Sequence, residues 1–412
     1  MKKLAICIPN YNKQEWFARL ISQSVEQVKH SGFTDDVEIC ISDDASQYNI
    51  TDDVNTIINE NHEVSIKYQR TEVNKGRWGN IKEVIDMSSA EFCWVIGNDD
   101  IYAQEDAIDV VVKKLCDKVF DIMTFPGMSF NGEKYEKDNQ LFPETTSRLF
   151  NLTIGDDFDK WFGEPLSQYN FFSDSMLVVF RKTLWNKFVN EVQLDDDGFG
   201  FWIVMGIIAL KGGTLYYYNN HLIVRNNKDK QTRWKSGRFC FLYLRDILEY
   251  IKKLKTINIK AAELLDRCRS VWYVYYYGVI IESNEVTASQ QRYIKIHTSE
   301  RLKLIDRLYF PSSRLAELKG KPIFIFGTGD IGNKVRSKLD SLEIAMDFYI
   351  DNDIKKQGEF IDGIEVISLQ ESLRTPNGIY IISAAKNDAI TSIYKQLINI
   401  GVTTDRTIMI RI

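Results

Sequence analysis

The chain has 412 residues, of which 44% are hydrophobic and 12% aromatic, and it carries a formal net charge of -5 at pH 7. Because this length exceeds that of one ordinary domain, we expect two or three compact units, each with its own core. The acidic balance offers no basic face to a polyanion, so nucleic acid is disfavoured as a partner.

Cysteine usage and apolar runs indicate the compartment. The six cysteines are scattered without a CxxC pair, which is typical of buried, reduced thiols. No apolar run reaches the roughly 18 to 20 residues of a membrane span, and the opening stretch is too short for a signal peptide. We expect a cytoplasmic protein, and we leave open a peripheral contact at the inner face of the membrane and a contact between identical copies.

The first part of the chain, to about residue 115, alternates short β-rich runs with helical patterns. The expected strands are 4–9, 37–42, 64–69 and 92–97, and the expected helices are 15–28, one after Thr51, and 78–86. Further strands at 175–180 and 214–219, with a helix at 200–211 between them, extend this pattern. The alternation predicts a mostly parallel sheet with helices on its faces, in a first domain at 1–235.

A change of period marks the rest of the chain. Residues 236–318 have apolar side chains at helical spacing, and we expect a helical section there. Its aromatic run at 271–281 suits a core helix better than a partner surface. From residue 319 the strand and helix alternation returns, which predicts a third, small α/β domain at 319–412.

Polar segments follow four of the expected strands in the first domain. They are PNYN at 9–12, DDAS at 43–46, NKGR at 74–77 with an asparagine one turn later, and GNDD at 97–100. Ligands of open parallel sheets bind beyond the carboxyl ends of the strands, so we expect these segments to form one site.

In order and spacing, these segments resemble the motifs of glycosyltransferase family 2, over roughly residues 1–235. The resemblance implies a domain of the GT-A type and transfer of a sugar, generally with inversion, from a nucleoside-diphosphate donor. We expect a UDP-sugar as the donor and a glycan or lipid-linked saccharide as the acceptor, in cell-surface polysaccharide synthesis. The expected fold class is therefore α/β, with a GT-A domain, a helical middle section and a small C-terminal Rossmann-like domain.

The acidic pair after the fourth strand is the expected metal site. Carboxylates that hold Mn²⁺ or Mg²⁺ neutralise the diphosphate as it leaves. By resemblance, Asp100 binds the metal and Asp99 contacts the metal or the ribose, while Asn98 stands where many relatives carry another acid. The alternative is that the pair caps a helix beginning near Gln104.

The remaining donor contacts come from the other three segments. By resemblance, Asp43 or Asp44 hydrogen-bonds the uracil or the ribose, and Pro9 and Tyr11 form a wall for the base. An Asx-type turn in DDAS is compatible with that role. Arg77 is suited to a donor phosphate, with a plain surface charge as the alternative.

The catalytic base is expected in the segment LDDDGFG that precedes the expected helix 200–211. An inverting transfer needs a carboxylate to accept the proton of the acceptor hydroxyl. The resemblance points to Asp197, with Asp196 second, and helix capping or a solvated acidic turn is the alternative. Downstream, His221 is a candidate metal or phosphate ligand beside a basic loop at 226–237 that is suited to closing over a diphosphate.

A second ligand motif opens the C-terminal domain. Gly327, Gly329 and Gly332 form G-x-G-x-x-G between an expected strand and helix, and Asp351 ends the next strand, as in a dinucleotide fingerprint. The domain resembles small Rossmann-like domains attached to bacterial polysaccharide and sugar-modifying enzymes, and we expect an accessory nucleotide-binding or docking role. Two alternatives stay open: an NAD-dependent nucleotide-sugar oxidoreductase and a non-catalytic nucleotide-sugar-binding protein.

Overall fold

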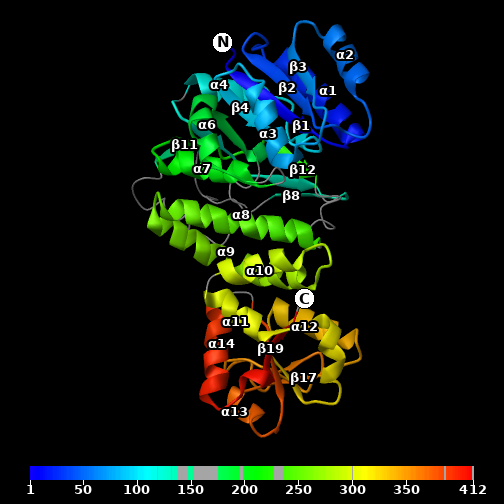
Figure 1. Ribbon diagram of the computed structural model, residues 1–412, viewed down its shortest axis with the longest axis vertical. Helices are drawn as coiled ribbons and strands as arrows, with labels where there is room; N and C mark the ends of the chain where they lie inside the picture. The colour runs from blue at the N-terminus through cyan, green and yellow to red at the C-terminus, as the bar shows by residue number, and fades with distance from the viewer. Residues whose placement is uncertain are drawn as a thin grey trace. The chain divides into compact units, whose positions relative to one another are not determined.

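The computed structural model describes residues 1–117, 119–130, 132–137, 147–151, 175–194, 198–226, 236–298, 300–384 and 387–410. The chain separates into two compact units (Figure 1). One consists of residues 1–233 and 249–268, and the other of residues 234–248 and 269–412.

In the described part of the chain, the main sheet of the first unit has eight strands in the order β3-β2-β1-β4-β10-β6-β11-β9. The bounds are β1 Leu4–Asn10, β2 Val37–Asp43, β3 Ser65–Arg70, β4 Phe92–Val95, β6 Ile122–Thr124, β9 Arg148–Asn151, β10 Val178–Arg181 and β11 Thr214–Tyr217. Strands β3, β2, β1 and β4 are parallel neighbours, the first three drawn in blue in Figure 1. Strand β10 is antiparallel to both of its neighbours. The expected mostly parallel α/β sheet is confirmed.

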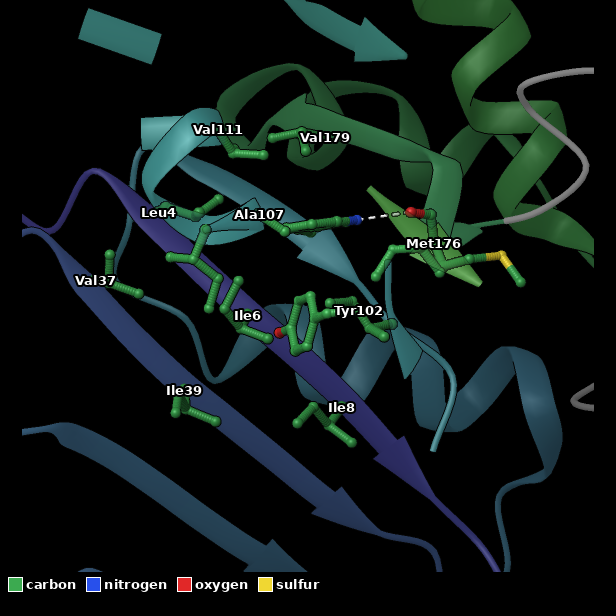
Figure 2. Close-up of a cluster of buried hydrophobic side chains, with 14 of the residues drawn as sticks. Leu4, Ile6, Ile8, Val37, Ile39, Tyr102, Ala107, Val111, Met176 and Val179 are labelled. Atoms are coloured by element: carbon green, nitrogen blue, oxygen red, sulfur yellow. Dashed lines mark hydrogen bonds between the residues drawn. The ribbon is translucent and has the colours of Figure 1, made fainter. Parts of the chain in front are cut away.

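The core of this unit follows from the alternation of side chains along each strand. Leu4, Ile6 and Ile8 of β1 lie on one face with Val37 and Ile39 of β2 (Figure 2). Helices α1 (Gln14–His30) and α4 (Ala107–Asp117) contribute to the same cluster. Within this cluster, Trp94 Nε1 donates a hydrogen bond of 2.7 Å to the Met176 carbonyl. The intervening residues of β1 are buried too, so both faces of the strand are covered, as in other parallel sheets.

The described residues of this unit also form helices α2 (Thr51–Glu60), α3 (Gly76–Asp86), α6 (Lys182–Phe188) and α7 (Gly200–Leu210). Helix α7 is buried along its whole length because it is apolar on every face. Glycines let neighbours approach it closely: the ring of Tyr250 occupies the space that a Cβ at Gly206 would need.

A smaller sheet in the same unit has the order β5-β12-β7-β8. Its strands are β5 Ile101–Tyr102, β7 Met128–Phe130, β8 Tyr135–Lys137 and β12 Ile223–Asn226. Strand β12 is antiparallel to β5. This pairing brings the segment around His221 beside the chain that follows the GNDD segment.

The described residues of the second unit form a seven-stranded sheet in the order β13-β19-β18-β14-β15-β17-β16. The strands are β13 Tyr309–Phe310, β14 Ile323–Phe326, β15 Phe348–Ile350, β16 Phe360–Ile361, β17 Ile364–Ile367, β18 Ile379–Ile382 and β19 Thr407–Ile410. Only the β16–β17 pair is antiparallel among the described strands of this sheet. Helices α10 Ala288–His297, α11 Glu300–Leu308, α12 Asp330–Asp340, α13 Leu369–Ser372 and α14 Asn387–Asn399 belong to this unit.

The expected helical section at 236–318 is not a separate unit. Helices α8 (Gly237–Lys255) and α9 (Ile259–Glu282) each contribute residues to both units. Strand β13 pairs with β19, which ties the end of the section to the C-terminal sheet. In the described part of the aromatic run, Tyr276, Tyr277 and Ile280 are buried, which fits a core helix. No helix in the described ranges has the length and apolar character needed to cross a membrane.

Candidate functional site

Four segments meet at the carboxyl ends of β1 to β4, as the parallel sheet requires. The backbone N–H of Asp44 donates to the Asn10 carbonyl at 2.9 Å, which joins the ends of β1 and β2. The side chain of Asn80, in α3, donates to the same carbonyl at 3.1 Å. The side-chain amide of Asn98 donates to Asn10 Oδ1 at 2.7 Å, which joins the segment after β4. The strand-end segments picked out in the sequence therefore form one cluster.

The PNYN and DDAS segments lock each other through their backbones. The backbone N–H of Asn12 donates to Ser46 Oγ at 3.0 Å, and the N–H of Gln47 donates to Asn12 Oδ1 at 2.7 Å. Asn12 has a positive φ of 51°, which asparagine tolerates better than most residues. The loop leaves Pro9 half-buried and Tyr11 45% exposed. An apolar ring at this edge is accessible to a flat ligand.

Asp43 lies in the interior of the cluster. Its side chain is fully buried and accepts hydrogen bonds from Asn10 Nδ2 at 2.8 Å, from Ser46 Oγ and from the guanidinium of Arg70. Both carboxylate oxygens are thus engaged by the chain itself. In this arrangement Asp43 has no exposed oxygen for the predicted contact with a base or ribose. One of its oxygens is taken by the guanidinium of Arg70, at the end of the neighbouring strand β3.

Asp44 is also buried, at 2% exposure. It accepts from the backbone N–H of Lys75 at 2.7 Å and from Thr71 Oγ1 at 3.2 Å, so it ties the DDAS segment to the NKGR segment. Burial raises the pKa of Asp44, although hydrogen bonds from Lys75, Thr71 and Gly76 act in the opposite direction. These hydrogen bonds order the DDAS and NKGR segments relative to each other. A contact of Asp44 with a ligand stays a prediction.

The acidic pair lies in a tight turn. The backbone N–H of Asp100 donates to the Gly97 carbonyl at 3.0 Å, and the N–H of Gly97 donates back to Asp100 Oδ2 at 3.0 Å. Helix α4 begins only at Ala107, so the alternative that the pair caps a helix near Gln104 is wrong. Asp100 is 4% exposed, whereas Asp99 is half-buried and has no hydrogen-bonding or ionic partner in the described part of the chain. Asp99 is therefore the carboxylate available to a ligand.

His221 contacts the backbone at Pro126. Its Nδ1 is 3.2 Å from the Pro126 carbonyl, and the ring is 8% exposed. Across the described residues, no three side chains of the His, Cys, Asp or Glu type gather as a metal site, so His221 does not complete one with Asp99 and Asp100. The described contact of this histidine is with the Pro126 carbonyl, and its role as a metal or phosphate ligand stays a prediction.

The start of α7 is fixed against α3, next to the NKGR segment. A Cβ at Gly200 would lie 2.6 Å from the Trp78 ring, so the backbone rests directly on the indole. The guanidinium of Arg77 lies 4.4 Å from the centre of the Phe199 ring. Asp195, Asp196 and Asp197 lie outside the described residues, as do residues 227–235 of the basic loop. The described residue that follows the acidic run, Gly198, thus leads directly into a segment held at this site.

The glycines of the C-terminal motif have two different roles. A Cβ at Gly332 would collide with the Gly327 carbonyl, and a Cβ at Gly327 would lie 2.8 Å from Ser383 Oγ, so these two glycines serve close packing. A Cβ at Gly329 would meet open space. Asp351 accepts from Lys356 Nζ at 3.1 Å and from Thr328. Burial acts to raise the pKa of Asp351, but these hydrogen bonds and one from Asp353 lower it on balance.

Sequence reasoning missed Arg70 and the organising role of Asn10. Both are the last residues of their strands, and the register pairs Asp43 with Arg70 on one side and with Asn10 on the other. A basic residue at the end of a strand next to the DDAS strand was the available signal.

Comparison with known proteins matches two segments of the chain to protein families. Residues 5–175 match the family described as Glycosyl transferase family 2. This segment of the chain is therefore similar to a family 2 glycosyltransferase domain. The enzyme is accordingly a glycosyltransferase. Residues 319–408 match a second family, described as C2185-like, N-terminal.

Relatives extend the likeness beyond the matched family segment. The chain is 24% identical over 263 residues to abequosyltransferase RfbV of Salmonella typhimurium, which covers 62% of this chain and 74% of that protein. The crystal structure of S. aureus TarS 1-349 is similar with a TM-score of 0.50 and 13% identity, over 74% of this chain and 84% of that one. Its complex with UDP-GlcNAc gives a TM-score of 0.51 at 12% identity, over 74% and 85%. This likeness shows a GT-A type fold.

Proposed function

We propose that the protein transfers a sugar from a UDP-sugar, with inversion and with the help of a divalent cation, to a glycan or lipid-linked saccharide in cell-surface polysaccharide synthesis. The observation that carries the proposal is the turn at 97–100. It holds one buried and one available carboxylate at the sheet edge where the four strand-end segments meet.

The residues of this turn fit a divalent cation. Mg²⁺ and Mn²⁺ bind oxygen ligands, and Mg²⁺ in particular uses one or two carboxylates together with water and substrate phosphates. Asp99 and Asp100 are the residues that would hold the cation. When bound, the cation neutralises charge on the departing diphosphate.

The other residues of the site bind and orient the donor. Pro9 and the exposed ring of Tyr11 offer an apolar wall to the base. Asp43 and Asp44 act from the interior, by ordering the loops that line the donor. Arg77 is exposed at the N-terminus of α3, where its charge and the helix end both favour a phosphate.

Proton transfer is assigned to the acidic run before α7. Asp197 would accept the proton of the acceptor hydroxyl, with Asp196 as the second candidate. The support is positional: Phe199 and Gly200, two and three residues beyond Asp197, contact Arg77 and Trp78 of the third donor segment. UDP as the nucleotide is supported by the UDP-GlcNAc complex of TarS.

The C-terminal domain is proposed as an accessory module that binds a nucleotide or docks a partner. Open space at Gly329, beside the N-terminus of α12, leaves room for a phosphate. Deletion from residue 319 onward would remove the partner of β13, so point variants test this module better than truncation. If the module instead ran an NAD-dependent oxidoreductase, NADH would bind tightly and Asp351→Ala would weaken that binding.

A panel of nucleotide sugars with Mn²⁺, Mg²⁺ or a chelator tests the proposal. Thermal stabilisation by a UDP-sugar that requires metal is the expected result, because ligands that bind only the folded state raise its melting temperature. Stabilisation by NADH alone, with no response to any nucleotide sugar, would overturn it in favour of the oxidoreductase.

A further inference from the structure

A chain of hydrogen bonds runs through the interior of the donor cluster and ends at the turn of the acidic pair. It starts at Arg70, passes through Asp43 and Asn10, and reaches Asn98. Each member comes from a different strand end: β3, β2, β1 and the segment after β4. The first three members lie in a single row across the sheet, because Asn10 pairs with Asp43 and Asp43 pairs with Arg70 in the strand register.

The direction of every bond in this chain is fixed by its first link. Arg70 can only donate, and Asp43, which accepts from Arg70 and Ser46 as well, can only accept. Asn10 must therefore turn its Nδ2 group towards Asp43, at 2.8 Å, and its Oδ1 towards Asn98, at 2.7 Å. The residue at position 98 then has to be a donor. An amide meets this requirement and an ionised carboxylate does not.

We infer that Asn98 is a positioning residue, required to be an amide by Arg70 through Asp43 and Asn10, which anchors the turn that carries Asp99 and Asp100. The link to the cation and nucleotide rests on the proposed function, whereas the polarity of the chain rests on the contacts alone.

The inference makes a prediction opposite to simple charge counting. An extra carboxylate beside Asp99 and Asp100 should strengthen cation binding if only charge mattered. If Asn98 anchors the turn, Asn98→Asp places a carboxylate oxygen against Asn10 Oδ1, breaks the anchor and moves the turn. Metal-dependent binding of UDP then weakens by about tenfold, since displacement of a ligating group by ~1 Å has effects of this order or larger.

Reversing the polarity of the chain provides a second, independent test. In the double variant Asp43→Asn with Asn98→Asp, Asn10 can turn over, accept from the new amide and donate to the new carboxylate. Net charge is unchanged by the pair of substitutions. The hydroxyl of Ser46 can accept instead of donating, and the amide oxygen at position 43 can still accept from Arg70.

The experiment measures melting temperature and Mn²⁺-dependent UDP affinity of the full chain. Asn98→Asp should lower the melting temperature by about 3–8 °C, and Asn98→Ala, which adds no acid, by less. The fall in melting temperature of the double variant should be smaller than the sum of the falls in the two single variants, by about 2 °C or more, because the substituted residues interact. Asn55→Asp on the exposed face of α2 is the matched control and should change neither quantity.

Additive thermal losses, or a loss in Asn98→Ala at least as large as in Asn98→Asp, would overturn the inference. Tighter UDP binding by Asn98→Asp would also overturn it. If Asn98→Asp does not fold, recovery of folded protein in the double variant supports the inference, and failure to recover it refutes it. Absence of UDP binding by the unsubstituted protein would instead contradict the proposed function, while the thermal comparison would still decide the polarity of the chain.

Discussion

Replacing Gly97 by alanine tests whether the turn at 97–100 holds Asp100 in place. The backbone of Gly97 does not adopt a left-handed φ, so alanine is conformationally allowed there. Its Cβ would lie 2.7 Å from Asp100 Oδ2, which is too close for any settled contact. Asp100 is 4% exposed, so its carboxylate has to turn away and give up the 3.0 Å hydrogen bond from Gly97.

The cost of this change follows from two opposing effects. A hydrogen bond to a charged group contributes about 1.5–3 kcal/mol. The lower entropy of the unfolded chain returns about 0.4–1 kcal/mol when alanine replaces glycine. The net loss is about 1–2 kcal/mol, which corresponds to a fall in melting temperature of about 2–8 °C for a unit of this size.

The assay compares this loss with metal-dependent UDP affinity, measured well below the melting temperature. Gly97→Ala should weaken the affinity by about tenfold or more, because it displaces a carboxylate of the proposed cation site. Gly206→Ala is the comparison variant, since its Cβ would collide with Tyr250 inside the helical packing. It should lower stability by about 1–2 kcal/mol, after allowing for improved helix propensity, and leave UDP affinity unchanged. Equal affinity in both variants would refute the role assigned to the turn.

Three further predictions concern other parts of the first unit. Asp100→Ala should abolish Mn²⁺-dependent binding of the donor, and unchanged affinity in a calorimetric titration would contradict that. Asp197→Asn should keep donor affinity and lose transfer, as measured by nucleotide release with acceptor present; near-normal turnover would move the base to Asp196 or out of the loop. Burial acts to raise the pKa of Glu38, but hydrogen bonds from Lys67 and Ser89 lower it on balance. The ionised carboxylate therefore stabilises the fold above pH 4.5, and this stabilisation is lost as the pH falls through the lowered pKa. Glu38→Gln should therefore have a lower melting temperature at pH 7 and a shallower loss on acidification; parallel curves for the two proteins would refute this.

Much of the architecture was predictable because it depends on local patterns. The alternation of apolar residues in β1 and β2 predicts strands within one or two residues of their observed ends. Parallel strands then bring their carboxyl ends to one edge, so the sequence alone gathers PNYN, DDAS and GNDD into one site.

What the sequence could not supply are contacts that depend on register and on orientation. Asp43 and Asp44 are adjacent acids in the sequence, yet one is held by Arg70 from the neighbouring strand and the other by Lys75 from the next loop. The choice between Asp99 and Asp100 as the available carboxylate depends on a single turn. The pairing of β13 with β19 could not be read from the sequence either, because it joins segments far apart in the chain.

The most direct test of the account is metal-dependent cleavage of a nucleotide sugar by the full chain. The account predicts that nucleotide release from a UDP-sugar requires Mn²⁺ or Mg²⁺, stops on chelation and falls by at least about a hundredfold in Asp99→Asn. Asp35→Asn, the same change at an exposed position outside the cluster, should release nucleotide at the rate of the unsubstituted protein. Release that is indifferent to chelation, or equal in the two variants, would contradict the central claim that this acidic turn binds the donor through a cation.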